Sequence, residues 1–326
     1  MIISRTPLRV SFAGGGTDLK GYYKTGYGAV VSCTIKKYAY VTVNKRFDDD
    51  IRVSYSKTEI VDSVDDIEHG LVREALRKVG IRNGMEITTI ADIPSKGTGL
   101  GSSSAITVGL LNALYAFKGY RAGPKKLAEE ACEIEIDVLK EPIGKQDQYI
   151  AAYGGMQHIR FNADDTVVLN PVICPPDTKR ELEDHMMMFY TGRTRKAKDV
   201  LKEQKANIPE KKETLDRVRD QAEQLFLDLT SLQVSKMGSL LRDGWELKKS
   251  FADGISDPEI DKLYETAIAA GAEGGKIAGA GGGGFLVLFA RPENHWAVRN
   301  ALNGLKETEF KLEPQGSKII YVGDDY

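Results

Sequence analysis

The chain has 326 residues, a length that favours two packed domains over one compact core. Its 45 basic and 47 acidic residues give a formal net charge of −2 without a dense basic block, which argues against nucleic acid as a partner. The apolar run FLVLFA is too short to span a bilayer, and the N-terminus MIISRTPLRV has no signal-peptide pattern. These features predict a cytoplasmic protein without a membrane partner.

Cysteine and histidine usage excludes two further classes of site. The three cysteines are far apart in the sequence, so neither a disulfide framework nor a paired CxxC zinc site is indicated. The four histidines are equally scattered, and none forms an HExxH motif. We therefore expect buried thiols and no protein-ligated transition metal.

The first half of the chain begins with a sheet. Residues 27–55 alternate apolar and polar positions, which is typical of half-buried strands. A helix follows with Leu71, Ala75 and Val79 on one face, because these positions share the helical spacing. The next predicted elements are a strand at 85–94, a helix at 125–139, and strands at 154–162 and 166–172.

The second half is richer in helix. The proline-containing segment 175–184 is predicted to be a break, and we place a domain boundary near residue 178, giving domains 1–178 and 179–326. Mixed strand and helix order in both halves favours two α+β units over a doubly wound parallel sheet. The remaining predicted elements are a strand HMMMFYT, charged helices over 195–243 and 258–271, and strands FLVLFA and KIIYVGD.

The stretch GTGLGSSSA joins the strand at 85–94 to a strongly helical run. Its serines can cap a helix that begins near Ala105. Gly97, Gly99 and Gly101 let the backbone turn its N–H groups toward one point beside the positive end of the helix dipole, which makes an anion site suited to phosphate. A tight turn with a serine cap explains this segment about equally well.

Two other glycine clusters bear on this choice. The stretch lacks the GK[ST] ending of a Walker A loop, and the GxGxxG at Gly279, Gly281 and Gly284 opens a strand, so neither a P-loop nor a dinucleotide site is indicated. A further cluster, FAGGGTD, places Asp18 where its carboxylate could accept hydrogen bonds from hydroxyls. Three glycine-rich loops predict one composite pocket.

Together, RTPLRVSFAGGGTD, PSKGTGLGSSSA and KIAGAGGGGF resemble the three signature motifs of the GHMP kinases, and they span nearly the whole chain in order. The resemblance implies an N-terminal domain like ribosomal protein S5 domain 2 and a ferredoxin-like C-terminal domain. It also implies ATP held between the domains with Mg²⁺, and it is compatible with a homodimer. The second motif would bind the nucleotide phosphates through Gly97, Gly99, Leu100, Gly101, Ser102, Ser103 and Ser104.

The resemblance also implies roles for particular side chains. Ser103 and Glu135 would hold Mg²⁺, although Glu135 could instead lie on a solvated acidic helix face. Asp147, in GKQDQYIAAYGG, would accept the proton of the attacking hydroxyl. Arg9 would keep Asp147 charged or neutralise the transferred phosphoryl group, unless it forms only a surface salt bridge. The acceptor would contact Gly14, Gly15, Gly16, Thr17, Asp18, Gly281 and Gly282.

The segment YTGRTRKA carries a basic cluster after a strand. Arg193 and Arg195 could bind a phosphate on the acceptor, and a solvated helix start explains the cluster about as well. GGGTD with YTGRTRKA is most similar to the heptose 7-phosphate kinases of the family. This implies a small-molecule sugar phosphate that is phosphorylated at its anomeric hydroxyl to the 1,7-bisphosphate, on a route to GDP-heptose for surface glycans.

Two alternatives remain open at the level of sequence. One is a kinase of an unphosphorylated sugar, similar to fucokinases or galactokinases, and the other is a catalytically silent sensor of sugar and ATP. Where galactokinases have GEHTD, this chain has Gly15 and Gly16, which leaves room for a longer exocyclic chain or only eases a turn. Lys276 lies just before the third motif, and nothing in the sequence indicates whether it reaches the pocket.

Overall fold

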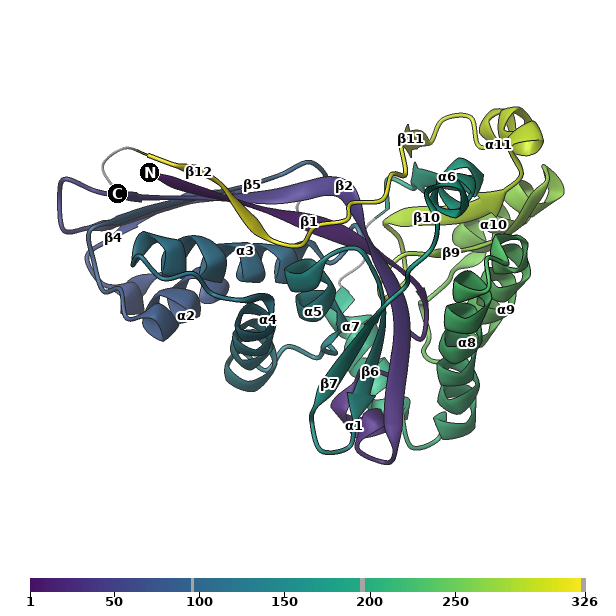
Figure 1. Ribbon diagram of the computed structural model, residues 1–326, viewed down its shortest axis with the longest axis horizontal. Helices are drawn as coiled ribbons and strands as arrows, with labels where there is room; N and C mark the ends of the chain where they lie inside the picture. Colours follow the sequence, from purple (N-terminus) through teal and green to yellow (C-terminus); the bar gives the residue numbers. More distant parts are fainter. Residues whose placement is uncertain (95–96, 194–196, 324–326) are drawn as a thin grey trace.

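The computed structural model describes residues 1–94, 97–193 and 197–323 (Figure 1). Its strands form two sheets, each covered by helices. The first sheet contains β1 (Ile2–Ala13), β2 (Tyr27–Lys45), β3 (Ile51–Ser54), β4 (Thr58–Val61), β5 (Met85–Ala91), β6 (Met156–Asn162), β7 (Val167–Pro171) and β12 (Lys318–Val322). The second contains β8 (Met186–Tyr190), β9 (Ala272–Ile277), β10 (Phe285–Ala290) and β11 (Lys306–Thr308).

The helices fall into an N-terminal and a C-terminal set. The first set is α1 (Lys20–Tyr23), α2 (Gly70–Val79), α3 (Ser102–Phe117), α4 (Pro124–Cys132), α5 (Gln146–Tyr153) and α6 (Pro176–His185). The second set is α7 (Ala197–Asn207), α8 (Lys212–Thr230), α9 (Met237–Lys249), α10 (Pro258–Ala269) and α11 (His295–Ala301). None of these helices is long and apolar enough to cross a membrane.

The long strand β2 organises the first sheet. Its C-terminal part pairs with β5 and its N-terminal part pairs with β6, while β1 runs antiparallel along most of its length. The sheet order is β12-β1-β2-β5-β3-β4, and β6 and β7 continue from β2. Figure 1 shows α2, α3, α4 and α5 on one face of this sheet. Helix α3 packs on β1 and β2 and is apolar on most sides, as expected of a helix enclosed by other elements.

The second sheet has the order β11-β8-β10-β9, and its neighbouring strands are antiparallel. Helix α9 packs on β9, and the fully buried Trp245 of α9 lies in the core of this part of the chain. Helix α8 also packs on β1 and β2, so the two sheets are joined through a shared apolar core. Mixed strand and helix order confirms the predicted α+β class.

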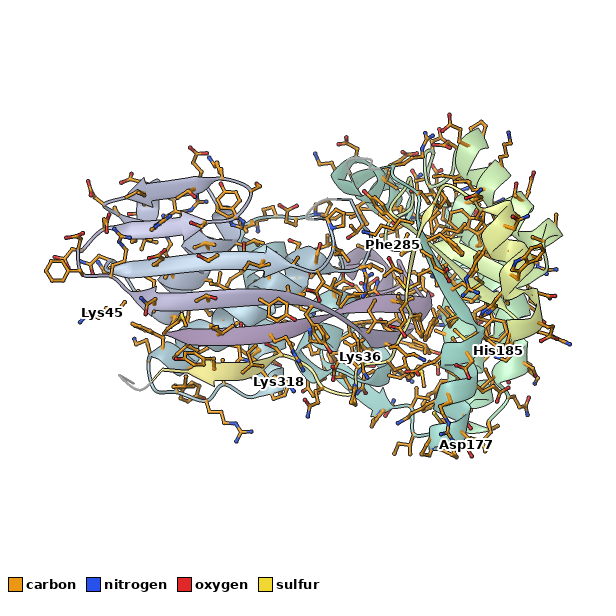
Figure 2. All side chains as sticks on the ribbon, turned by 90° about the horizontal axis from the view of Figure 1, so that it is seen from above. Lys36, Lys45, Asp177, His185, Phe285 and Lys318 are labelled. Carbon is orange, nitrogen blue, oxygen red and sulfur yellow. The ribbon has the colours of Figure 1, made fainter. Side chains whose placement is uncertain are left out.

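One predicted element is wrong. The expected break at 175–184 is largely helix α6, because Pro176 stands at the first helical turn, where the missing N–H of proline is no loss. Figure 2 shows α6, marked by Asp177 and His185, on the part of the molecule that contains Phe285. The predicted boundary at residue 178 thus falls inside a helix. The last strand, β12, lies in the second predicted domain and pairs with β1 in the first sheet.

Candidate active site

The loop before α3 has the backbone that its glycines suggest. Gly97, Gly99 and Gly101 have φ angles of +69°, +73° and +71°, in the left-handed region that glycine occupies without strain. The helix begins at Ser102 instead of near Ala105, and no serine side chain caps it. The capping prediction was wrong because Gly101 itself turns the chain into the helix, which places the serines in the first helical turn.

The third glycine-rich loop, between β9 and β10, packs directly against this loop. A methyl group on Gly99 would overlap the carbonyl oxygen of Ala278, and the backbone N–H of Phe285 donates to the Thr98 carbonyl over 3.3 Å. Backbones from the two halves of the chain therefore meet without intervening side chains. This close approach requires glycine at both loops.

Arg9 connects Asp147 to the glycine loop. Its Nε and Nη2 donate to the two carboxylate oxygens of Asp147 over 2.7 and 2.8 Å, which is a bidentate ion pair. Its Nη1 donates to the carbonyl of Gly99, and its backbone N–H donates to the Leu100 carbonyl over 3.0 Å. A β-carbon on Gly101 would lie 3.2 Å from Oδ2 of Asp147. The carboxylate at the start of α5 is therefore fixed beside the start of α3.

Asp18 is a second carboxylate at this place, and it is buried. Its Oδ1 and Oδ2 accept hydrogen bonds from the backbone N–H groups of Gly16 and Gln146, over 3.1 and 3.2 Å. Burial, with the negative charge of Asp147 as a smaller cause, raises the pKa of Asp18 to about 6. Two acidic groups thus lie close together with different environments.

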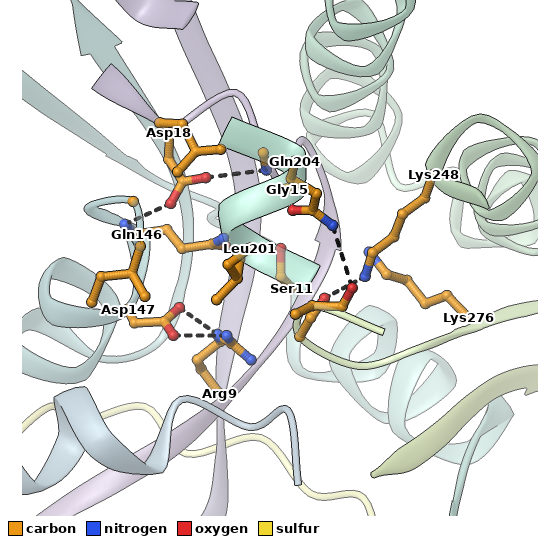
Figure 3. A pocket seen from close by; sticks show the side chains of 16 residues that line it. Arg9, Ser11, Gly15, Asp18, Gln146, Asp147, Leu201, Gln204, Lys248 and Lys276 are labelled. Atoms are coloured by element: carbon orange, nitrogen blue, oxygen red, sulfur yellow. Dashed lines mark hydrogen bonds and ion pairs between the residues drawn. The ribbon is translucent and has the colours of Figure 1, made fainter. Parts of the chain in front are cut away.

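These side chains face one cavity (Figure 3). The cavity receives three kinds of contribution: the first motif, the α5 region, and side chains from the C-terminal half. Its lining is Arg9, Ser11, Gly15, Gly16, Asp18, Leu19, Ile143, Gly144, Gln146, Asp147, Leu201, Gln204, Lys248, Lys276, Gly279 and Ala280.

Four residues of the glycine-rich motifs that were expected at the acceptor site do not line this cavity. Gly14 packs its α-carbon against the backbone of Ala29, and the Thr17 hydroxyl donates to the carbonyls of Gly14 and Ala29, so both shape the loop. Gly281 packs against Ile255. Gly282 donates its backbone N–H to the Ile255 carbonyl over 2.8 Å. Their contribution is to hold the glycine loops in position.

Five polar lining residues were not assigned to the site from the sequence: Ser11, Gln146, Gln204, Lys248 and Lys276. The position of Lys276 next to the third motif was a signal that it could reach the pocket. The sequence contains no such signal for Lys248, because two adjacent lysines near the end of a charged helix are typical of a solvated face.

Glu135 is fully enclosed, so it does not lie on a solvated helix face. It sits in a π-helical turn, Glu133–Val138, that follows α4. Its carboxylate accepts hydrogen bonds from Ser104 Oγ over 2.7 Å, from Gln148 Nε2 over 2.6 Å, and from the Thr107 hydroxyl. The structure therefore brings Ser104 to Glu135, whereas Ser103 is exposed.

Arg193 lies outside the cavity lining. Its guanidinium forms ion pairs with Asp257 over 3.0 Å and with Glu259. Two carboxylates thus already compensate its charge. Arg195, the other member of the predicted phosphate-binding pair, lies outside the described residues.

The buried state of Glu135 has a consequence for stability. Burial raises its pKa to about 7, against hydrogen bonds from Thr107, Ser104 and Gln148 that lower it. The ordinary pKa of a glutamate is 4.5. Between pH 4.5 and about pH 7, the folded chain therefore binds more protons than the unfolded chain. This contribution to the free energy of unfolding is complete below pH 4.5 and is lost as the pH rises through 7.

Glu135→Gln should remove this pH dependence. Compared with wild type, the variant should gain about 1 kcal/mol or more in free energy of unfolding between pH 5 and pH 8, measured by urea denaturation without nucleotide or metal. Glu133→Gln is the matched control, because Glu133 is the exposed glutamate of the same segment. Equal pH profiles for wild type and Glu135→Gln would contradict the enclosed, proton-binding state of this group.

The chain is similar in sequence to known kinases over both of its halves. The family descriptions "GHMP kinases N terminal domain" and "GHMP kinases C terminal" match residues 67–155 and 228–307. A D-glycero-alpha-D-manno-heptose 7-phosphate kinase of Campylobacter jejuni is 31% identical over 92% of this chain and 93% of its own length. An L-fucokinase/L-fucose-1-P guanylyltransferase of Bacteroides fragilis is 25% identical over 93% of this chain, which spans 36% of that longer protein.

A solved structure shows the same fold. The crystal structure described as a D-glycero-D-manno-heptose 1-phosphate kinase, from Bacteroides thetaiotaomicron, superposes with a TM-score of 0.82 at 26% identity. The superposition covers 99% of this chain and 100% of the chain in that structure. With both family domains matched in order and a relative above 30% identity along nearly the entire length, this chain belongs to the GHMP kinases.

Proposed function

We propose that the protein transfers the γ-phosphoryl group of ATP to the anomeric hydroxyl of D-glycero-D-manno-heptose 7-phosphate, giving the 1,7-bisphosphate. The observation that carries this proposal is the Asp147–Arg9 ion pair fixed beside the glycine loop and open to the cavity. The names of the Campylobacter relative and of the Bacteroides structure support a heptose phosphate as acceptor, although they differ in the position of its phosphate.

The reaction needs one proton acceptor and donors for the transferred group. The acceptor hydroxyl would lie against Asp147, which takes its proton as the oxygen attacks the γ-phosphorus. The bond from the γ-phosphorus to the bridging oxygen breaks, and ADP leaves with that oxygen. Arg9, already bound to Asp147 and to the loop carbonyl of Gly99, would face the charge that develops on the phosphoryl group.

The glycine loop would bind the nucleotide phosphates. Three left-handed glycines precede the N-terminus of a sixteen-residue helix, and N–H groups at such a junction favour anions. In this proposal Gly97, Gly99, Leu100 and Gly101 contribute backbone donors, and Ser102 and Ser103 contribute the first turn of α3. ATP is the phosphate donor on which GHMP kinases act, so the loop and the family agree.

The chain also offers ligands that fit Mg²⁺. Glu135 is a buried carboxylate without a cationic partner among the described residues, and Ser104 Oγ lies 2.7 Å from it at the start of α3. Carboxylate and hydroxyl oxygens suit Mg²⁺, which also takes ligands from substrate phosphates. Glu135 with Ser104 or the adjacent Ser103 would hold the ion, which would supply charge neutralisation between the nucleotide phosphates.

Room for a heptose side chain is present beside Asp18. Gly15 lines the cavity, and a β-carbon placed there would meet nothing nearer than Ser11 Oγ at 4.0 Å. This open space supports the idea that the GGGTD segment leaves room for a longer exocyclic chain. Asp18 would accept hydrogen bonds from hydroxyls of the sugar, since the side chain lies on the cavity wall.

A coupled ADP-release assay over sugars and sugar phosphates tests this proposal. We expect heptose 7-phosphate to give the highest kcat/KM and the product to carry its new phosphate at C1, as read by ³¹P NMR. The similarity to the Bacteroides fragilis fucokinase makes free fucose the main competing acceptor. A preference for an unphosphorylated sugar would support that alternative, and no ADP release with any acceptor would support a silent sensor.

A further inference from the structure

Two buried lysines line the cavity and have no part in the reaction as derived above. Lys276 belongs to β9 and Lys248 to α9, and each is only 8% exposed. Figure 3 shows both on the side of the cavity opposite Asp18 and Asp147. The C-terminal half of the chain therefore presents two ammonium groups to a cavity whose acidic groups come from the N-terminal half.

The charge of these lysines is not compensated within the described residues. Lys276 Nζ donates to the carbonyl of Phe12 over 3.2 Å. Lys248 Nζ donates to the carbonyls of Ile277, over 3.3 Å, and Gly279. No described carboxylate forms an ion pair with either group. Because an ammonium has three N–H donors, Lys276 keeps two donors and Lys248 keeps one beyond these bonds.

The electrostatics agree with this geometry. Burial, with the positive charge of the nearby Arg9 as a smaller cause, lowers the pKa of Lys276 to about 8. Burial, Lys276 and Arg9 lower the pKa of Lys248 well below its usual range. Uncompensated buried charges are costly, and an anionic ligand would remove that cost. Arg9 does not add a further uncompensated charge, because the carboxylate of Asp147 already neutralises it.

A third polar group marks the same place. The hydroxyl oxygen of Ser11, on β1, is buried, lines the cavity, and has no hydrogen-bond partner. Buried polar atoms of this kind usually have a partner. One unused hydroxyl and three unused ammonium donors therefore belong to the cavity lining, and the two lysines lie on the side away from Asp18 and Asp147 (Figure 3).

We infer that Lys248, Lys276 and Ser11 bind the phosphate group that the sugar acceptor already carries, so that the acceptor spans the cavity with its reacting hydroxyl at Asp147. This inference rests on the proposed function and assigns the phosphate specificity to residues other than Arg193. The cavity that the lysines share contains Gly15, Gly16 and Asp18 of the first motif but none of Gly97, Gly99 and Gly101. An acceptor phosphate therefore fits this place better than a nucleotide phosphate.

Arg193 is a poorer candidate than the two lysines for binding the phosphate of the acceptor. Arg193 has two carboxylate partners and lies outside the cavity lining, whereas each lysine has carbonyl partners only and faces the cavity. A phosphate would have to displace Asp257 and Glu259 to reach Arg193. At the lysines it would meet donors that no acid occupies.

Lys276→Met and Lys248→Met test the inference, with Lys249→Met as matched control. Lys249 is the neighbour of Lys248 on α9, does not line the cavity, and is paired with Glu246 over 2.9 Å. We expect each cavity variant to raise the KM for heptose 7-phosphate about tenfold or more, with the KM for ATP unchanged. The kcat/KM for the same heptose without its phosphate should stay at the wild-type value, and Lys276→Arg should restore part of the loss.

A binding measurement gives a readout that does not depend on turnover. Inorganic phosphate titrated into the protein saturated with ADP, which would occupy the glycine loop, should show saturable binding by calorimetry, which Lys276→Met abolishes and Lys249→Met retains. Circular dichroism and thermal unfolding of each variant show whether it is folded. If Lys276→Met does not fold, Lys248→Met and Ser11→Ala carry the same comparison.

The outcomes separate the inference from the proposed function. Equal losses for the phosphorylated and unphosphorylated heptose, or a rise only in the KM for ATP, would overturn the inference and leave the kinase in place. A wild-type protein that phosphorylates no sugar, yet binds inorganic phosphate through Lys276, would keep the anion site and remove the proposed function. Absence of saturable phosphate binding in the wild type would overturn the site itself.

Discussion

Asp147→Asn should lower kcat by about 10²- to 10⁴-fold, the range for loss of a positioned proton acceptor. Asparagine keeps one oxygen for the Arg9 guanidinium but cannot take the hydroxyl proton. The dissociation constant for ATP should change little, because the nucleotide phosphates are expected at the glycine loop and not at this carboxylate. Single-turnover ADP release and nucleotide calorimetry measure the two quantities separately.

Asp137→Asn is the matched control for this substitution. It makes the same chemical change at an exposed aspartate in the chain segment that leads to α5. Its kcat should equal that of wild type. If Asp147→Asn retained more than a tenth of the wild-type kcat, Asp147 would not be the proton acceptor, and its bidentate bond to Arg9 would have only a structural role.

Gly99→Ala should have the largest effect of any single methyl group in the phosphate loop. The new β-carbon would overlap the backbone of Ala278 and Gly279, and the residue would be held at φ +73°. Backbone strain and overpacking each cost about 1–3 kcal/mol, so the free energy of unfolding should fall by about 2–6 kcal/mol. The two glycine loops should also separate, which should weaken ATP binding about tenfold or more.

Gly119→Ala isolates the strain from the overlap. Gly119 has nearly the same φ, +74°, but a β-carbon there meets nothing within 4 Å. Its cost should be about 1 kcal/mol with no change in ATP affinity. Urea denaturation and nucleotide calorimetry compare the two variants. Equal values for both would show that the packing between the glycine loops does not support the nucleotide site.

Local sequence determined much of this architecture. Apolar alternation predicted the strands of residues 27–55, and helical spacing predicted α2, because each pattern reflects the face that its element buries. The three glycine clusters were also informative, since few residues other than glycine adopt the φ angles found at Gly97, Gly99 and Gly101. The pairing of Arg9 with Asp147, 138 positions apart, followed from the family resemblance and not from any local pattern.

The first strand shows where local patterns fail. Strand β1 contains Pro7 and two arginines, residues that are uncommon in the interior strands of a sheet. It nevertheless lies between β12 and β2. The register shifts between Pro7 and Leu8, and such irregularities are where a strand accommodates proline. The partner β12 comes from the other end of the chain, so no short window of sequence could predict this pairing.

The glycine loops, most strands and helices, and the family could be predicted from the amino-acid pattern, because these depend on backbone conformation and on periodicity along the chain. The folded structure was needed to show that Lys248 faces the cavity while Lys249 pairs with Glu246 outside it, and that Glu135 alone among its acidic neighbours is enclosed. Charge patterns look alike on either face of a helix, so they do not show which charged group is buried. Burial is set by the element packed against that face, which here is a distant part of the chain.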